Sequence, residues 1–119
     1  HSQCVFNGRV FVAEGADGTD SSQSNHNLLL SDRAEIDTKP ELEIYADDVK
    51  CAHGATVGQL DQSALFYLRS RGLNLKESQR VLTRAFASGT LSKLAIDASY
   101  SYLTGLLEKK LESLVGTTT

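Results

Sequence analysis

The first half of the chain carries short apolar runs and alternating apolar and polar positions, which is the pattern of half-buried β-strands. The alternation is clearest in one stretch, where the apolar positions are Ala34, Ile36, Leu42 and Ile44. Pro40, which interrupts this stretch, cannot donate a hydrogen bond to a sheet and therefore predicts a corner or the start of a strand.

Turn-forming residues separate the other apolar runs of this half. Asn7-Gly8 stands between two runs rich in Val and Phe, and the pair suits a turn with positive φ, so a hairpin is predicted there. The polar stretch from Gly15 to Ser24 predicts a loop, and His26 is expected in a polar loop with Asn25 and Asn27. Leu28 to Leu30 predict a short buried strand.

Near residue 60 the pattern changes to the period of amphipathic helices. Asp61 is placed to cap the first helix, and Asn74 with Glu77 has the spacing of a capping box that opens the second. Glycines are expected to end the first two helices. The first predicted helix ends at Gly72 and the second at Gly89. The third and longest is predicted from about Asp97 to Val115, and Gly116 ends it.

The change of period divides the chain into residues 1–60 and 61–119. Strands as short as those of the first part cannot bury both faces within one small sheet, so we expect the sheet to continue into further chain or to pair with a second copy. The chain begins with His1-Ser2 and ends in three threonines, which favours a piece of a longer protein with an unstructured end.

Composition narrows the possible functions. The 119 residues have a net charge of -3, which removes the electrostatic basis for a dedicated nucleic-acid binder. No apolar run reaches the roughly 18 residues needed to cross a bilayer, and no signal peptide is expected. Two cysteines are too few for a disulfide framework and favour reduced thiols in a reducing compartment.

Cys51 and His53 are the candidate ligands of the chain. In an extended strand they share one face with Cα atoms about 6.6 Å apart, and thiolate with imidazole suits zinc, iron or an iron–sulfur cluster. Two donors do not complete a site, so the alternative is a small buried Cys51 and a structural His53. Cys4 and His26 could complete such a site, but nothing in the local sequence directs them there. No nucleophile elbow, phosphate-binding loop or Cys-x-x-Cys motif is present, so the chain is not expected to be an enzyme.

Much of the chain resembles a known family. The stretches DTKPELEIYADDVKCAHG (37–54), GQLD (58–61) and LFYLRSRG (65–72), with QSN (23–25) and NLLLS (27–31) upstream, resemble the carboxy-terminal part of the SufB/SufD family of iron–sulfur cluster assembly proteins. Gly54 follows His53 where the SufB branch has an acidic residue, so the likeness is greater to the SufD branch.

The resemblance implies a mixed β and α fold: the last rungs of a right-handed parallel β-helix over residues 1–60, then a small helical domain over 61–119. Asn7-Gly8 would then be a corner between rungs rather than a hairpin turn. It also implies the partners of a scaffold component, a SufC-type ATPase docked by the helical domain and a SufB-type protein facing Cys51 and His53. The residues expected to contact the ATPase are Leu65, Leu68, Arg69, Val81 and Phe86.

The resemblance further implies that the chain holds no tightly bound cofactor, and that an iron–sulfur cluster or iron is present only transiently, in the full complex. The bacterial cytoplasm or the plastid stroma is the expected location. Because the first rung would expose unpaired strand edges, the isolated chain is expected to form a homodimer. The alternative function is a pure interaction module that recruits the ATPase and holds no metal or cluster.

Overall fold

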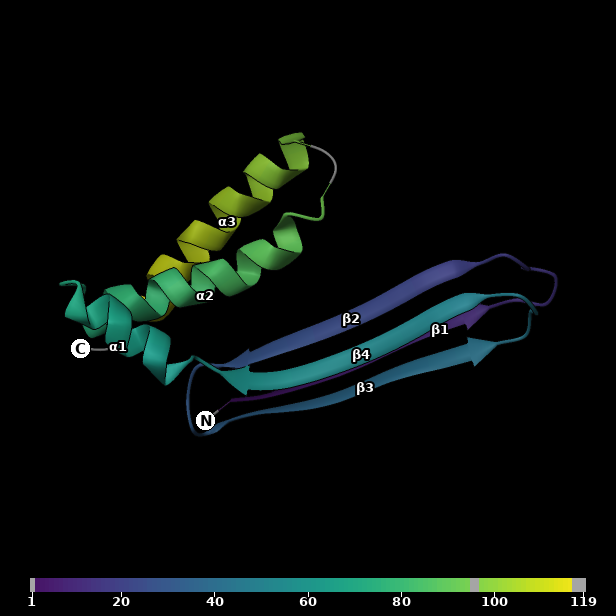
Figure 1. The fold of residues 1–119 in the computed structure, drawn as a ribbon, viewed down its shortest axis with the longest axis horizontal. Helices are drawn as coiled ribbons and strands as arrows, with labels where there is room; N and C mark the ends of the chain where they lie inside the picture. The colour runs from purple at the N-terminus through teal and green to yellow at the C-terminus, as the bar shows by residue number, and fades with distance from the viewer. Residues whose placement is uncertain (1, 95–96, 117–119) are drawn as a thin grey trace. The chain divides into compact units, whose positions relative to one another are not determined.

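The computed structural model describes residues 2–94 and 97–116, which form two compact units, His1–Gln59 and Leu60–Thr119 (Figure 1). The first unit contains strands and the second contains helices, which confirms the mixed β and α class. The end at residues 117–119, expected to be unstructured, lies outside the described residues.

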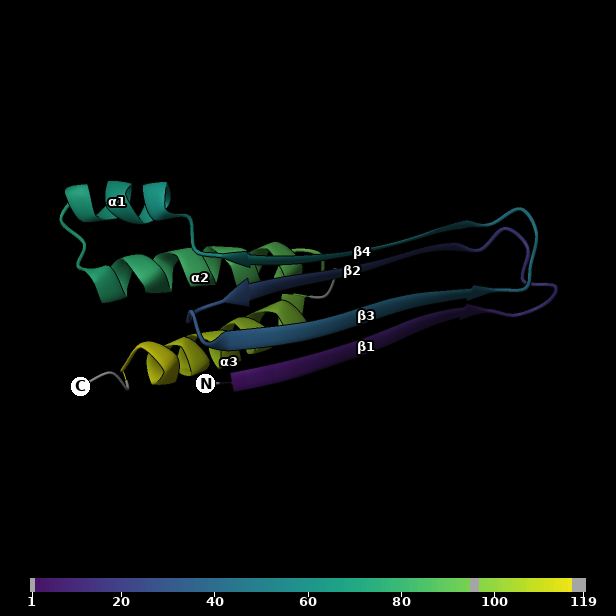
Figure 2. The same ribbon diagram turned by 90° about the horizontal axis from the view of Figure 1, so that it is seen from below.

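The β unit has four strands in two parallel sheets. The strands are β1 (Ser2–Val12), β2 (Asp20–Leu29), β3 (Ala34–Ile44) and β4 (Lys50–Gln59). β1 pairs with β3 in one sheet, and β2 pairs with β4 in the other. Each strand therefore pairs with the strand two places along the chain, and the chain passes back and forth between the sheets (Figure 2). The faces that the two sheets turn toward each other are called the inner faces below.

The register shows that the chain makes two similar circuits between paired strands. Ser2 lies opposite Ala34 in the first sheet, and Asp20 lies opposite Lys50 in the second. In each sheet this register continues without a slip to the ends of both strands. The chain therefore uses nearly the same number of residues to pass from β1 to β3 as from β2 to β4, and in both cases the two paired strands run in the same direction.

Two turn predictions in this half are wrong. β1 runs without interruption through Asn7-Gly8, so this pair forms neither a hairpin turn nor a corner. Pro40 lies inside β3 opposite Gly8, not at a corner or strand start. Within the described residues β3 has a neighbour on one side only, and an edge strand tolerates a residue that lacks a backbone donor.

The predicted polar loop is also partly wrong, because β2 begins at Asp20 and includes His26. Four of its half-buried positions on the inner face are polar, Ser21, Gln23, Asn25 and Asn27, and Leu29 alone on this face is apolar. Asn25 Nδ2 donates to Thr38 Oγ1 of β3 at 2.5 Å, a bond that joins the two sheets. Polar side chains thus take the place that apolar residues usually hold on an inner face, which is why hydrophobic periodicity missed this strand.

The outer face of the first sheet carries a linked polar cluster. Arg9 Nη1 lies 2.9 Å from Glu43 Oε2, and Tyr45 donates its hydroxyl hydrogen to Glu43 Oε1 at 2.7 Å. The pKa of Tyr45 is raised because this hydrogen bond, and then the negative charge of Glu43, favour the neutral phenol.

We expect Glu43→Gln to lower the pKa of Tyr45 toward its ordinary value, because the substitution removes the carboxylate charge. The Tyr45–Glu43 interaction stabilises the fold below the ordinary phenol pKa, and this contribution is lost as the pH rises through the raised pKa. Ultraviolet titration of phenolate absorbance in a background that carries Tyr67→Phe, Tyr100→Phe and Tyr102→Phe measures Tyr45 alone. An unchanged titration curve in Glu43→Gln would contradict the assigned cause.

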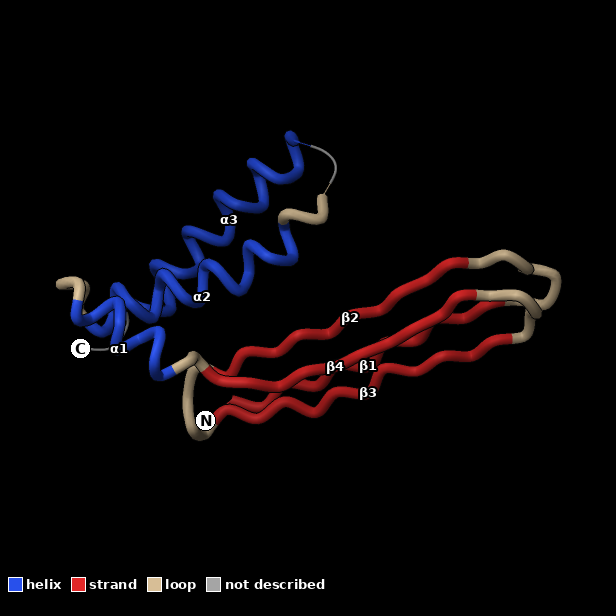
Figure 3. Tube along the Cα trace, in the orientation of Figure 1, coloured by secondary structure: helices blue, strands red, loops and turns tan. Residues whose placement is uncertain are grey.

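The described part of the second unit consists of helices joined by loops (Figure 3). Its helices are α1 (Gln62–Ser70), α2 (Leu75–Leu91) and α3 (Asp97–Gly116). The Asp61 side chain accepts from the backbone N–H of Ser63 at 2.8 Å, which confirms it as the cap of α1. Gly72, with φ of 98°, follows the last turn, and its N–H donates to the carbonyl of Arg69 at 3.1 Å.

The capping box of α2 is confirmed. Asn74 Oδ1 accepts from the Glu77 backbone N–H at 3.0 Å, and Glu77 Oε2 accepts from the Asn74 backbone N–H at 2.8 Å. The predicted stop at Gly89 is wrong, because α2 continues to Leu91. A glycine with ordinary helical φ costs a helix only about 1 kcal/mol, and α2 packs on α3.

The helical unit has a small core and a linked α2–α3 interface. Leu65 and Leu111 are buried, as is Ser78, whose hydroxyl donates to the Asn74 carbonyl at 2.9 Å. Arg84 Nε of α2 lies 2.7 Å from Glu108 Oε1 of α3. Many large apolar side chains of this unit nevertheless stay exposed.

Candidate functional site

The two predicted ligands lie on β4, the last strand of the β unit. Cys51 lies opposite Ser21 and His53 opposite Gln23 in the parallel pairing of β4 with β2. Because Ser21 and Gln23 are half-buried positions of the inner face, Cys51 and His53 also belong to that face. The prediction that Cys51 and His53 share one face of a strand is confirmed.

The two side chains differ in exposure. Cys51 is half-buried with a free thiol, whereas His53 is exposed. Over the described part of the chain, no hydrogen bond holds the imidazole of His53. A neutral imidazole with a bare nitrogen is the form that binds a metal, and an exposed ring offers it to an incoming partner.

Cys51 and His53 alone do not form a closed metal site. A structural zinc or iron site takes four ligands. In residues 2–94 and 97–116, no group of three or more His, Cys, Asp or Glu side chains is placed to hold a metal ion. Cys51 and His53 therefore account for two of the donors that such a site needs.

The other two candidates are not brought to this pair. Cys4 is an exposed free thiol on β1, in the other sheet. His26 lies on β2, and its Nδ1 is 2.9 Å from Thr56 Oγ1 of β4. Since an odd number of steps along β2 separates His26 from Gln23, His26 lies on the opposite face of the sheet from His53. The expectation that His26 sits in a loop is wrong.

The residues expected to contact a partner lie at different depths in the helical unit. Leu65 is 6% exposed, so it belongs to the core of this unit and offers little surface. Leu68 is half-buried. The other three are more exposed. Arg69 is exposed, and Val81 and Phe86 each keep about two fifths of their surface accessible to a partner.

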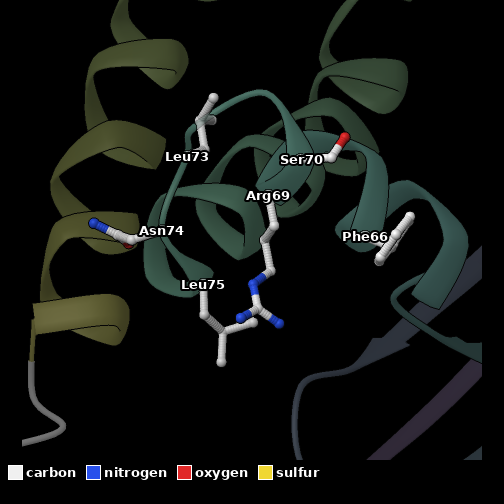
Figure 4. Close-up of a pocket in the computed structure, with 6 residues that line it drawn as sticks. All are labelled: Phe66, Arg69, Ser70, Leu73, Asn74 and Leu75. Carbon is white, nitrogen blue, oxygen red and sulfur yellow. The ribbon is translucent and has the colours of Figure 1, made fainter.

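Exposed aromatic and basic residues flank the connection between α1 and α2, and we call this stretch the basic corner: Phe66, Tyr67, Arg69, Arg71 and Leu75. Phe66 is 75% exposed, and the guanidinium of Arg71 lies 5.2 Å from the ring centre of Tyr67. A depression of about 480 Å³ opens here, lined by Phe66, Arg69, Ser70, Leu73, Asn74 and Leu75 (Figure 4).

The periodicity of the sequence pointed to Leu65 and Leu68 and missed most of this corner. The available signal was the pair Phe66-Tyr67, because α1 already places Leu65 in the core and neighbouring helix positions point about 100° away from it.

Charge separates the two units. Residues 1–59 hold ten acidic and four basic residues, a net charge of -6, whereas residues 60–119 hold eight basic and five acidic residues, a net charge of +3. Between Gln62 and Leu75 the charged residues are Arg69 and Arg71 alone. The nearest acidic side chains along the chain, Asp61 and Glu77, are engaged in helix caps. The basic corner therefore favours an acidic partner.

The chain matches a family model described as the SufBD core domain of SUF system FeS cluster assembly over residues 1–86. It belongs to this SufB/SufD family, as the sequence resemblance predicted.

Relatives place the chain near SufD within the family. It is 56% identical over 86 residues to the iron–sulfur cluster assembly protein SufD of Escherichia coli, covering 72% of this chain and 20% of that protein. It is 33% identical over 108 residues to SufD of Bacillus subtilis, and the match covers 91% of this chain and 25% of that protein. It is also 39% identical over 109 residues to the chloroplastic protein ABCI7 of Arabidopsis thaliana, covering 88% and 23%. The chain thus spans a quarter or less of the length of these relatives.

Among the described helices, none combines the length and the apolar character needed to cross a membrane.

Proposed function

We propose that the chain is the carboxy-terminal part of a SufD-like scaffold component in iron–sulfur cluster assembly. The observation that carries the proposal is the exposed imidazole of His53 beside the thiol of Cys51, on one face of the last strand. Since these two donors need others to complete a site, a SufB-type protein supplies the remaining ligands across a subunit interface. The nascent cluster or iron is cargo of the complex, and the chain itself catalyses no reaction.

In this proposal the β unit forms the last turns of a right-handed parallel β-helix. The support is the unbroken parallel register of each strand with the strand two places along the chain, and the passage of the chain between two sheets. Further turns would pair with the free edges of β1 and β2, and an isolated chain would cover such edges by homodimerisation. The bacterial cytoplasm or the plastid stroma, both reducing, suits the free thiols of Cys4 and Cys51.

The helical unit docks a SufC-type ATPase in this proposal. Its support is the number of large apolar side chains that the unit leaves exposed, with Phe66 and Tyr67 foremost. Aromatic and Arg side chains dominate the binding energy of protein interfaces, and the basic corner combines both. An acidic, apolar segment of the ATPase would fit it.

The double variant Arg69→Glu, Arg71→Glu tests the docking. We expect it to weaken binding of the chain to a SufC-type ATPase about tenfold or more in calorimetry, because like charges would face each other. The matched control is Lys109→Glu, Lys110→Glu, which makes the same charge change at exposed positions of α3. Equal weakening in both variants would show a general charge effect, and an ATPase that does not bind the unaltered chain would refute docking altogether.

A pure interaction module is the second candidate function. It is favoured by the lack, within the described residues, of any group of three potential metal ligands. In that case Cys51 and His53 are structural, and only the helical unit has a binding role.

A further inference from the structure

Gln23 lies beside His53 on the inner face of the second sheet. The two residues are opposite each other in the register of β2 and β4. Neighbouring strands lie about 4.8 Å apart and opposed side chains project from the same face. A glutamine side chain is long enough to span this separation, so a change of its rotamer can bring it to the imidazole of His53.

The amide of Gln23 packs against the opposite sheet, next to Gly8 of β1. A Cβ added to Gly8 of β1 would overlap Gln23 Nε2 and would come within 2.8 Å of the Phe6 ring. The glycine thus leaves the space in which the amide nitrogen sits. This packing places the end of the flexible Gln23 side chain between the two sheets, and its other polar atom is buried there as well.

That other atom, Oε1, is buried and, as far as the described residues go, accepts no hydrogen bond. A buried acceptor without a partner is rare in folded proteins and calls for an explanation. His53, directly opposite Gln23 in the register, offers an imidazole N–H as a donor.

A histidine that binds a metal commonly donates the N–H of its other nitrogen to a carbonyl or carboxylate oxygen, which fixes the tautomer and the ring orientation. We propose that Gln23 is the positioning residue of His53: Gln23 Oε1 accepts the imidazole N–H and leaves the second nitrogen bare for iron or a cluster. The inference rests on the proposed function insofar as His53 is a ligand, but the hydrogen bond itself can be tested without any metal.

Nuclear magnetic resonance of the chain labelled with ¹⁵N-histidine reports the tautomer of each imidazole directly. We expect one predominant tautomer for His53 at a pH where the ring is neutral. Gln23→Met keeps the length of the side chain but removes the acceptor, and it should change the tautomer ratio about fivefold toward that of a free imidazole. Gln23→Glu restores an acceptor and should restore the single tautomer.

Asn25→Leu is the matched control, because Asn25 lies on the same inner face of β2 but opposite Ala55. It perturbs the inner face and should leave the His53 tautomer unchanged. The His26 signal provides an internal reference in every spectrum, since its ring contacts Thr56 instead.

Two populated tautomers of His53 in the unaltered chain would overturn the inference, even if Gln23→Met failed to fold. Equal effects of Gln23→Met and Asn25→Leu would overturn it as well. Failure of the proposed function would give a different result. In that case His53 would keep a single tautomer that depends on Gln23, but loss of the His53 side chain would leave cluster assembly intact.

Discussion

Replacing Leu111 by Ala is expected to destabilise the helical unit by about 2–5 kcal/mol. Leu111 is 2% exposed and lies on α3, in a unit where few of the described apolar side chains are buried. Truncation would remove buried methyl groups and leave a cavity that so small a core cannot refill. Urea unfolding followed by circular dichroism at a helix-sensitive wavelength measures the loss.

Leu106→Ala is the matched control for this prediction. Leu106 lies on the same helix and undergoes the same chemical change, but it is 45% exposed. We expect an effect below about 1 kcal/mol, because exposed truncations remove little buried area and Ala is the better helix former. Similar losses in both variants would contradict the described packing of α3.

Gly8→Ala is expected to destabilise the β unit by about 1–3 kcal/mol through overpacking. The new methyl group would overlap the amide of Gln23 and crowd the Phe6 ring at 2.8 Å. Gln23 is flexible at its end and can be displaced, but the displaced amide would lose its place between the sheets. An alanine ordinarily stabilises a strand relative to glycine, so a net loss would identify the clash as its cause.

Two further variants isolate that clash. Gly58→Ala on β4 meets no atom within 4 Å and should be neutral or slightly stabilising in the same unfolding measurement. Gly8→Ala combined with Gln23→Ala should recover much of the loss, because the second substitution frees the space that the methyl group needs. If the double variant is as unstable as the sum of its two single variants, Gln23 and Gly8 are not in contact.

The helical half was predictable because its signals are local. Asp61, Asn74 and Glu77 satisfy backbone groups within three residues of themselves, so their spacing alone identifies the helix starts. Gly72 ends α1 because the chain there takes a positive φ, whereas Gly89 keeps a helical conformation inside α2. Sequence does not distinguish these two uses of glycine.

The β half was harder because its stability is non-local. Asn7-Gly8 has the composition of a turn, but pairing with β3, two strands further along the chain, keeps it extended. β2 has a largely polar inner face and is held instead by β4 and by the bond from Asn25 to Thr38. Neither the partner strand nor that bond can be read from the local pattern of β2.

The candidate functional site was likewise predictable from the sequence only in part. The shared face of Cys51 and His53 follows from the two-residue period of a strand, so it was predictable. The position of Gln23 opposite His53 depends on the register of two strands, and the basic corner depends on how α1 and α2 pack. Both required the structure.

Cluster assembly by a reconstituted complex tests the central claim most directly. A full-length SufD-like protein that carries this sequence would be combined with a SufB-type protein and a SufC-type ATPase, and cluster formation followed by visible absorbance. We predict that His53→Ala abolishes or strongly slows cluster formation while ATPase binding stays intact, and that His26→Ala, on the opposite face of the sheet, has no effect. Normal assembly in a folded His53→Ala complex would contradict the account and leave the chain an interaction module.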